Sequence, residues 1–82
     1  HLAETPANLD AASAQFNRVI KDYEGSPKVA SSYYKLGTIA DLRNQRNEAR
    51  QLMQTVVNRF SDSAEAGLAK NYLDQNPADV TR

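Results

Sequence analysis

The stretch that decides the fold runs from Phe16 to Gly37 and reads FNRVIKDYEGSPKVASSYYKLG. Apolar side chains stand three, four and seven positions after Phe16, which is the spacing of one face of an α-helix. The pattern breaks at Gly25, which can take the left-handed conformation that ends a helix without a Cβ clash. Ser26 followed by Pro27 predicts a new helix, because serine caps a first turn and proline there loses no hydrogen bond.

The same spacing continues outward from this stretch and predicts an all-α fold. The expected helices cover residues 8–23, 27–42, 46–60 and 64–75. No segment alternates with the period of two that a half-buried strand requires. The breaks between the helices are short, which indicates antiparallel helix hairpins.

Capping residues and prolines mark the ends of these helices. Asn8 or Asp10 is expected to cap the first helix and Ser63 the fourth. Asn76 is expected to end the fourth helix, because the residue before a proline avoids the α region. We therefore predict a flexible segment at 1–7, one helical domain at 8–76 and a frayed tail at 77–82.

Composition excludes several classes of function. The 82 residues contain 10 Lys and Arg against 10 Asp and Glu, so the chain lacks the excess positive charge of a nucleic-acid binder. There is no cysteine and the one histidine is His1, which leaves no histidine base for the serines and no Cys or His metal site. The neighbouring carboxylates Asp22 and Glu24 are expected to be solvated. We expect no enzyme activity, no cofactor and no metal.

The chain also repeats itself at an offset of 37 residues. Residues 16–23, FNRVIKDY, align with residues 53–60, MQTVVNRF. The apolar positions outside and within these segments align as Ala12 with Ala49, Val19 with Val56, Val29 with Ala66 and Leu36 with Leu73. A period in this range with two helices in each unit is typical of a helical solenoid. The aromatic positions Phe16, Tyr23, Tyr33 and Phe60 are expected in the core.

The repeat resembles the tetratricopeptide family. The residues that carry the resemblance are Tyr33-x₂-Leu36-Gly37, Ala49-x₃-Met53 and, from the preceding unit, Ala12-x₃-Phe16. Gly37 is small enough to let the second helix approach its neighbour closely. The resemblance implies a short superhelical stack of four helices that binds other proteins.

A narrower resemblance covers about residues 8–75. The string F-x-x-V-I-x-x-Y-x-x-S-P-x-V-A-x-x-x-Y-x-L-G resembles repeats of the Tol-Pal system YbgF (CpoB) family of cell division coordinators. It implies a periplasmic protein, made with a signal peptide, that binds TolA and a penicillin-binding protein. The repeats of the outer-membrane β-barrel assembly lipoprotein are similar and remain an alternative. The chain departs from both families at Glu24 and Ser61, where they have proline, and at Leu73-Asp74, which replaces the Leu-Gly pair.

One strip of side chains lies off the predicted core. On the second helix it contains Ser31, Tyr34, Thr38 and Asp41, and the offset of 37 maps it onto Leu68, Asn71 and Gln75. In tetratricopeptide domains the first helix of each unit lines the concave groove, so the resemblance implies that this strip binds a partner. An ordinary exposed helix face remains the alternative. Arg43, Arg46 and Arg50 are expected to form a solvated turn or to contact an acidic partner.

The ends of the stack raise a further expectation. The first predicted helix corresponds to the second helix of a unit, so one of its sides should lie uncovered. We therefore expect a homo-oligomer or a gain in stability on upstream extension. A purely structural or oligomerisation segment, or an accessory domain of an enzyme, remains an alternative to a groove that binds a partner.

Overall fold

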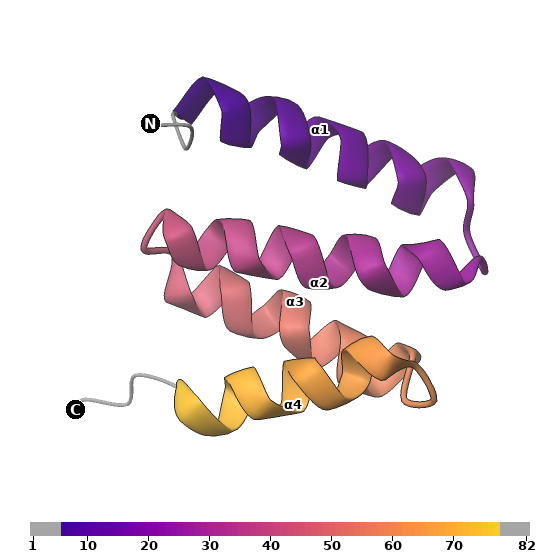
Figure 1. Ribbon diagram of the computed structural model, residues 1–82, viewed down its shortest axis with the longest axis vertical. Helices are drawn as coiled ribbons and strands as arrows, with labels where there is room; N and C mark the ends of the chain where they lie inside the picture. The colour runs from indigo at the N-terminus through magenta and orange to yellow at the C-terminus, as the bar shows by residue number, and fades with distance from the viewer. Residues whose placement is uncertain (1–5, 78–82) are drawn as a thin grey trace.

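Four α-helices, connected by short turns, make up the described part of the chain (Figure 1). The structure is a computed structural model and describes residues 6–77. The helices are α1 (Pro6–Asp22), α2 (Pro27–Leu42), α3 (Arg46–Arg59) and α4 (Ala64–Gln75). No strand occurs between residues 6 and 77, which confirms the all-α prediction. Each helix packs against the next in the chain, and α4 also contacts α2.

The start of α1 differs from the expectation. The helix begins at Pro6, so Asn8 and Asp10 lie inside it and neither is its N-cap. Proline is tolerated in the first turn because the N–H that it lacks has no partner there in any helix. The predicted flexible segment and frayed tail lie mostly at residues 1–5 and 78–82, outside the described residues. That division of the chain stays a prediction.

The other predicted caps are confirmed. The Ser26 Oγ accepts a hydrogen bond of 3.1 Å from the backbone N–H of Lys28. The Ser63 Oγ accepts one of 3.1 Å from the N–H of Ala66. Gly25 has a φ of +90°, the left-handed conformation that its place between α1 and α2 requires.

The end of α4 also follows the sequence. The helix stops at Gln75, and the backbone N–H of Asn76 donates to the Tyr72 carbonyl at 2.9 Å. Pro77 follows and cannot continue the helix. The local signals therefore predicted three of the four helix starts and this last helix end.

The core lies where α3 packs between α2 and α4. Ala49, Met53, Val56 and Ala69 are completely buried. Met53 lies against Gly37 of α2, and a Cβ built on Gly37 would stand only 2.8 Å from the Met53 Cε. The absence of a side chain at Gly37 therefore lets α2 and α3 cross closely, as the sequence predicted.

The aromatic residues divide into packed and exposed groups. Tyr33 and Phe60 are half-buried, and their ring centroids lie 6.0 Å apart in a tilted pair. Phe16 is half-buried too. The prediction that Tyr23 belongs to the core is wrong, because its side chain is 58% exposed. Tyr23 follows the last residue of α1, where only α2 is adjacent among the described helices.

The crossing at Gly37 predicts opposite effects for two glycines. Gly37→Ala should lower the free energy of unfolding by about 1 kcal/mol, since the Met53 side chain must move. Gly67 in α4 is the matched control, because a Cβ there would meet nothing within 4 Å. Gly67→Ala should raise stability by about 0.5–1 kcal/mol through helix propensity. Thermal and urea unfolding of both variants measure the difference, and a stabilising Gly37→Ala would contradict the close crossing.

Candidate functional site

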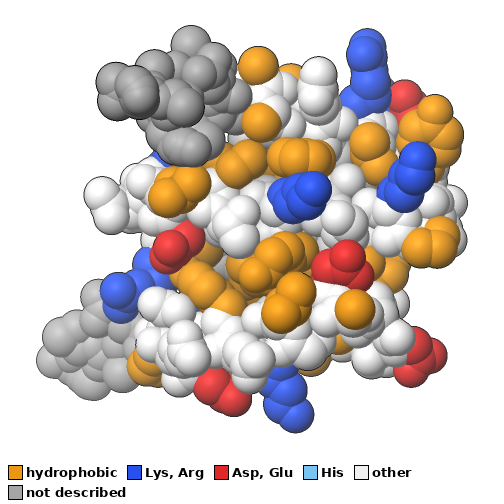
Figure 2. All heavy atoms as spheres, in the orientation of Figure 1, with side chains coloured by type: hydrophobic (Ala, Val, Ile, Leu, Met, Phe, Trp, Pro, Cys, Tyr) orange, Lys and Arg blue, Asp and Glu red, His pale blue; other side chains and the backbone are white. Residues whose placement is uncertain are grey.

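The two predicted rows of partner-binding residues lie on neighbouring helices. Because α2 and α4 are in contact, the row on α2 and the row on α4 belong to one face of the molecule. Figure 2 shows this face, with hydrophobic side chains gathered in its middle, between α2 and α4. We call this surface the α2–α4 face and define it by Ser31, Tyr34, Thr38, Asp41, Leu68, Asn71 and Gln75.

The side chains of the α2–α4 face differ in exposure. Leu68 is 50% exposed, which is unusual for a large apolar residue in this structure. Three polar side chains of the face are exposed to solvent, and these are Asp41, Asn71 and Gln75. Ser31 and Thr38 are half-buried, and the Thr38 hydroxyl donates to the Lys35 carbonyl at 2.7 Å.

Tyr34 corrects the sequence analysis in one respect. It was expected to be exposed and off the core, but it is half-buried and packs against the buried cluster formed by Met53, Val56, Ala66 and Ala69. The two alanines of α4 are small, which leaves room for the ring where α2 meets α4. Tyr34 therefore connects the face to the core, and its ring has only part of its surface free for a partner.

Sequence reasoning did not assign Tyr72 to this face. Its hydroxyl donates a hydrogen bond of 2.9 Å to the Asp41 Oδ1, so it joins α4 to α2 at one end of the α2–α4 face. Tyr72 follows Ala66 and Ala69 at spacings of three, which is the pattern of an apolar helix face and gives no indication of this bond. Two features of the sequence could have indicated this position. Tyr72 follows Asn71 of the face directly, and a tyrosine hydroxyl usually has a hydrogen-bond partner.

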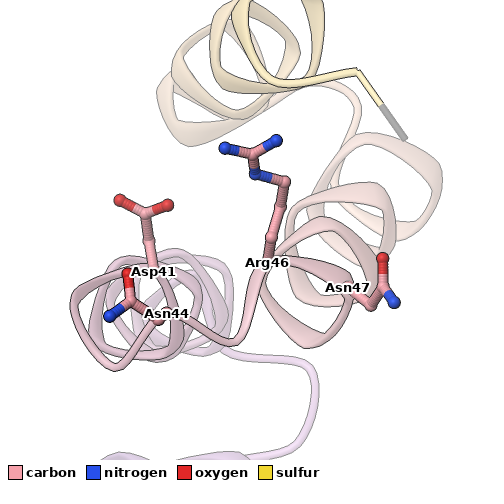
Figure 3. A pocket seen from close by; sticks show the side chains of 4 residues that line it. All are labelled: Asp41, Asn44, Arg46 and Asn47. Atoms are coloured by element: carbon pink, nitrogen blue, oxygen red, sulfur yellow. The ribbon is translucent and has the colours of Figure 1, made fainter. Parts of the chain in front are cut away.

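A polar pocket adjoins this end of the face. It has a volume of about 450 Å³ and is lined by Asp41, Asn44, Arg46 and Asn47. Figure 3 shows the Asp41 and Arg46 side chains extending from α2 and α3 toward α4, while Asn47 points away from them. Asn44 has a φ of +62°, which places it in the tight turn between the two helices. The pocket offers one carboxylate, one guanidinium and amide groups, which suit hydrogen bonds to a peptide.

The three arginines near this turn have separate roles. Arg43 forms a salt bridge with Asp10 and so joins α2 to α1. The Arg50 Nη1 donates to the Asn76 carbonyl at 2.6 Å and to the Leu73 carbonyl at 3.2 Å, which satisfies carbonyls at the end of α4. The expectation of a solvated arginine turn is wrong for these two, and Arg46 alone remains exposed. Asp22 and Glu24 are exposed, as predicted.

Burial raises the pKa of Tyr72 above its ordinary value of 10.0, and the hydrogen bond and negative charge of Asp41 raise it further. The positive charges of Arg46 and Arg50 oppose this shift of the pKa. The protonated phenol is therefore the form that holds α4 to α2.

Residues 6–77 contain neither a candidate membrane span nor a candidate metal cluster. No helix in that range has the length and apolar character that crossing a bilayer requires. The same range contains no group of three His, Cys, Asp or Glu side chains placed to hold a metal ion.

The fold and the face define the class of protein. It is a module of stacked helix hairpins in which α2 and α4 together form one solvated face. Residues 31–63, which cover most of α2 and all of α3, match the family model described as Tetratricopeptide repeat. The match spans less than half of the chain and supports a tetratricopeptide-repeat family. Such repeats are typically non-catalytic modules that bind other proteins. Comparison with curated proteins and with solved structures gave no match.

The bond between Tyr72 and Asp41 predicts a titration. Tyr72 should ionise above pH 10, and Asp41→Asn should bring its midpoint closer to 10 by removing the negative charge. The phenolate absorbance of each protein, minus that of its Tyr72→Phe counterpart, isolates this residue from the other three tyrosines.

The sign of the linked stability effect follows from the direction of the shift. A pKa that is higher in the folded state than in the unfolded state contributes stability that is fully present below pH 10. That stability is lost as the pH rises through the folded pKa of Tyr72. A midpoint at or below 10, or one that Asp41→Asn leaves in place, would contradict the assigned bond.

Proposed function

We propose that the chain is a protein-interaction module that binds a segment of a partner protein on the α2–α4 face. The observation that carries the proposal is Leu68, whose side chain is 50% exposed on a face that also contains the partly buried Tyr34. An apolar centre with a polar rim is the usual anatomy of a specific interface. Here the rim consists of the hydroxyl of Thr38 and the amides of Asn71 and Gln75.

The polar pocket extends the same surface. Asp41 and Arg46 stand on either side of it, close to Tyr72 of α4. On α2, Tyr34 and Asp41 are seven positions apart, which corresponds to roughly 10 Å along a helix axis. The partner segment that fits has an apolar anchor beside Tyr34 and hydrogen-bonding groups about two helical turns away.

We further propose that the module works in the envelope of a Gram-negative bacterium, in the periplasm. The support is the resemblance of residues 16–37 to repeats of the Tol-Pal system family. In that role the module would bind TolA and a penicillin-binding protein, and would link constriction of the outer membrane to peptidoglycan synthesis during division. A scaffold in outer-membrane β-barrel assembly is the alternative role that the same residues support.

Leu68→Glu provides a direct test of the α2–α4 face. The substitution places a charge at the apolar centre, so the affinity for a purified periplasmic fragment of TolA should fall at least severalfold. The free energy of unfolding should change by no more than about 0.5 kcal/mol, because the side chain is solvated. Isothermal titration calorimetry measures the affinity, and thermal unfolding measures the stability.

Leu42→Glu is the matched control, since Leu42 is 59% exposed and lies outside the α2–α4 face. It should leave the affinity unchanged. Equal affinities for the wild type and Leu68→Glu would remove the face as the binding site. A wild-type chain that binds neither TolA nor a penicillin-binding protein fragment would instead reject the Tol-Pal role.

A further inference from the structure

Two side chains of opposite charge line the polar pocket, yet they are not bonded to each other. Figure 3 shows the Asp41 carboxylate and the Arg46 guanidinium extending toward α4 from the two sides of the pocket. These two described residues form no salt bridge with each other. Both are exposed, so the end of the α2–α4 face offers one anionic and one cationic group.

The Asp41 carboxylate is bonded to a different residue. Its Oδ1 accepts the hydrogen bond of 2.9 Å from the Tyr72 hydroxyl. Burial and the Asp41 carboxylate raise the pKa of Tyr72, whereas the positive charge of Arg46 opposes this shift of the pKa. The Arg46 guanidinium therefore acts on the same hydroxyl that Asp41 accepts from, which puts the two opposite charges near enough to attract each other.

The other two arginines near this turn do not compete for Asp41. Arg43 is paired with Asp10, and Arg50 donates to backbone carbonyls at the end of α4. Arg46 is the arginine of this group that remains. An exposed ion pair is worth little in free energy, so a single hydrogen bond from Tyr72 is enough to decide which group the carboxylate contacts.

The Tyr72 hydroxyl has a fixed position that does not depend on Asp41. The ring of Tyr72 is half-buried and packs against the buried cluster around Met53. The two hydrogen bonds from Arg50 join the end of α4 to α3. Tyr72 can therefore orient a carboxylate that stands on the neighbouring helix α2.

We propose that Tyr72 is a positioning residue of the pocket, which holds the Asp41 carboxylate away from Arg46 and so keeps both charges available to the partner segment. The proposal rests on the proposed function, because the pocket is part of the surface that we assign to binding. A salt bridge between Asp41 and Arg46 would satisfy both groups, and a partner would have to break it before bonding to either. With Oδ1 held by Tyr72, Asp41 presents its second oxygen as an acceptor and Arg46 presents its N–H groups as donors.

Exchange of the Arg46 side-chain N–H groups with water, followed by NMR on the ¹⁵N-labelled chain, tests the positioning without any partner. A charge-assisted hydrogen bond to a carboxylate protects such a group. Tyr72→Phe should slow the exchange severalfold, because the released Asp41 pairs with Arg46, and adding Asp41→Asn should restore the wild-type rate. Tyr33→Phe is the matched control, since it removes a hydroxyl that bonds Arg59 instead, and it should leave the rate unchanged.

Affinity for the periplasmic TolA fragment tests the consequence for binding. Tyr72→Phe should weaken binding severalfold. Arg46→Gln should weaken binding in the wild type but add little beside Tyr72→Phe, where Arg46 is already paired. A residue that only joined α4 to α2 would not produce this dependence on Arg46.

The outcomes separate the positioning role from the proposed function. An Arg46 exchange rate that Tyr72→Phe leaves unchanged would overturn the positioning role, whatever the chain binds. Weaker binding by Leu68→Glu with unchanged binding by Tyr72→Phe would also overturn it, while the α2–α4 face would stand as the binding site. A wild-type chain that does not bind TolA counts against the Tol-Pal role, and the exchange rate then decides the positioning of Asp41 by itself.

Discussion

The close crossing of α2 and α3 at Gly37 and Met53 determines the geometry of the other contacts. Met53 is completely buried, and its side-chain atoms occupy the space that a side chain at residue 37 would need. With α3 held at this distance, α4 packs on the opposite side of Met53 and Val56 through Ala66 and Ala69. The position of α4 beside α2, and with it the α2–α4 face, follows from that arrangement.

Two surfaces result from one stack, and they have opposite character. The α2–α4 face combines a partly buried tyrosine, an exposed leucine and a polar pocket, so it suits a partner segment with mixed chemistry. The side of α1 that contains Ala12, Phe16 and Val19 is apolar and only half-buried, because α2 alone among the described helices packs on α1. Arg50 and Tyr72 secure the first surface by hydrogen bonds from α3 to α4 and from α4 to α2. Among the described helices α1 is held by α2 alone, through packing and the Arg43–Asp10 salt bridge.

Sequence reasoning succeeded where the signal is local and failed where it depends on a distant neighbour. Ser26 and Ser63 cap helices through backbone groups two and three residues away, so their roles could be predicted. The close approach at Gly37, whose contact Met53 lies on another helix, was predicted from the resemblance to the tetratricopeptide pattern. The burial of Tyr34 and the capping role of Arg50 both depend on the position of α4. No local sequence pattern predicts that position. The exposure of Tyr23 has the same origin, because its equivalent Phe60 pairs with Tyr33 while no described helix covers Tyr23 in that way. The seven candidate residues of the face were brought together on two adjacent helices, but their role in binding stays a prediction.

A double-mutant cycle on Gly37 and Met53 tests the central claim most directly. Unfolding free energies are measured for the wild type, Gly37→Ala, Met53→Val and the double variant. Met53→Val removes the Sδ and Cε atoms that a Cβ at residue 37 would meet at 3.2 and 2.8 Å. If that contact sets the crossing, Gly37→Ala is destabilising in the wild type and neutral or stabilising beside Met53→Val, with a coupling of about 1 kcal/mol. Additivity of the two substitutions within about 0.3 kcal/mol would contradict the claim.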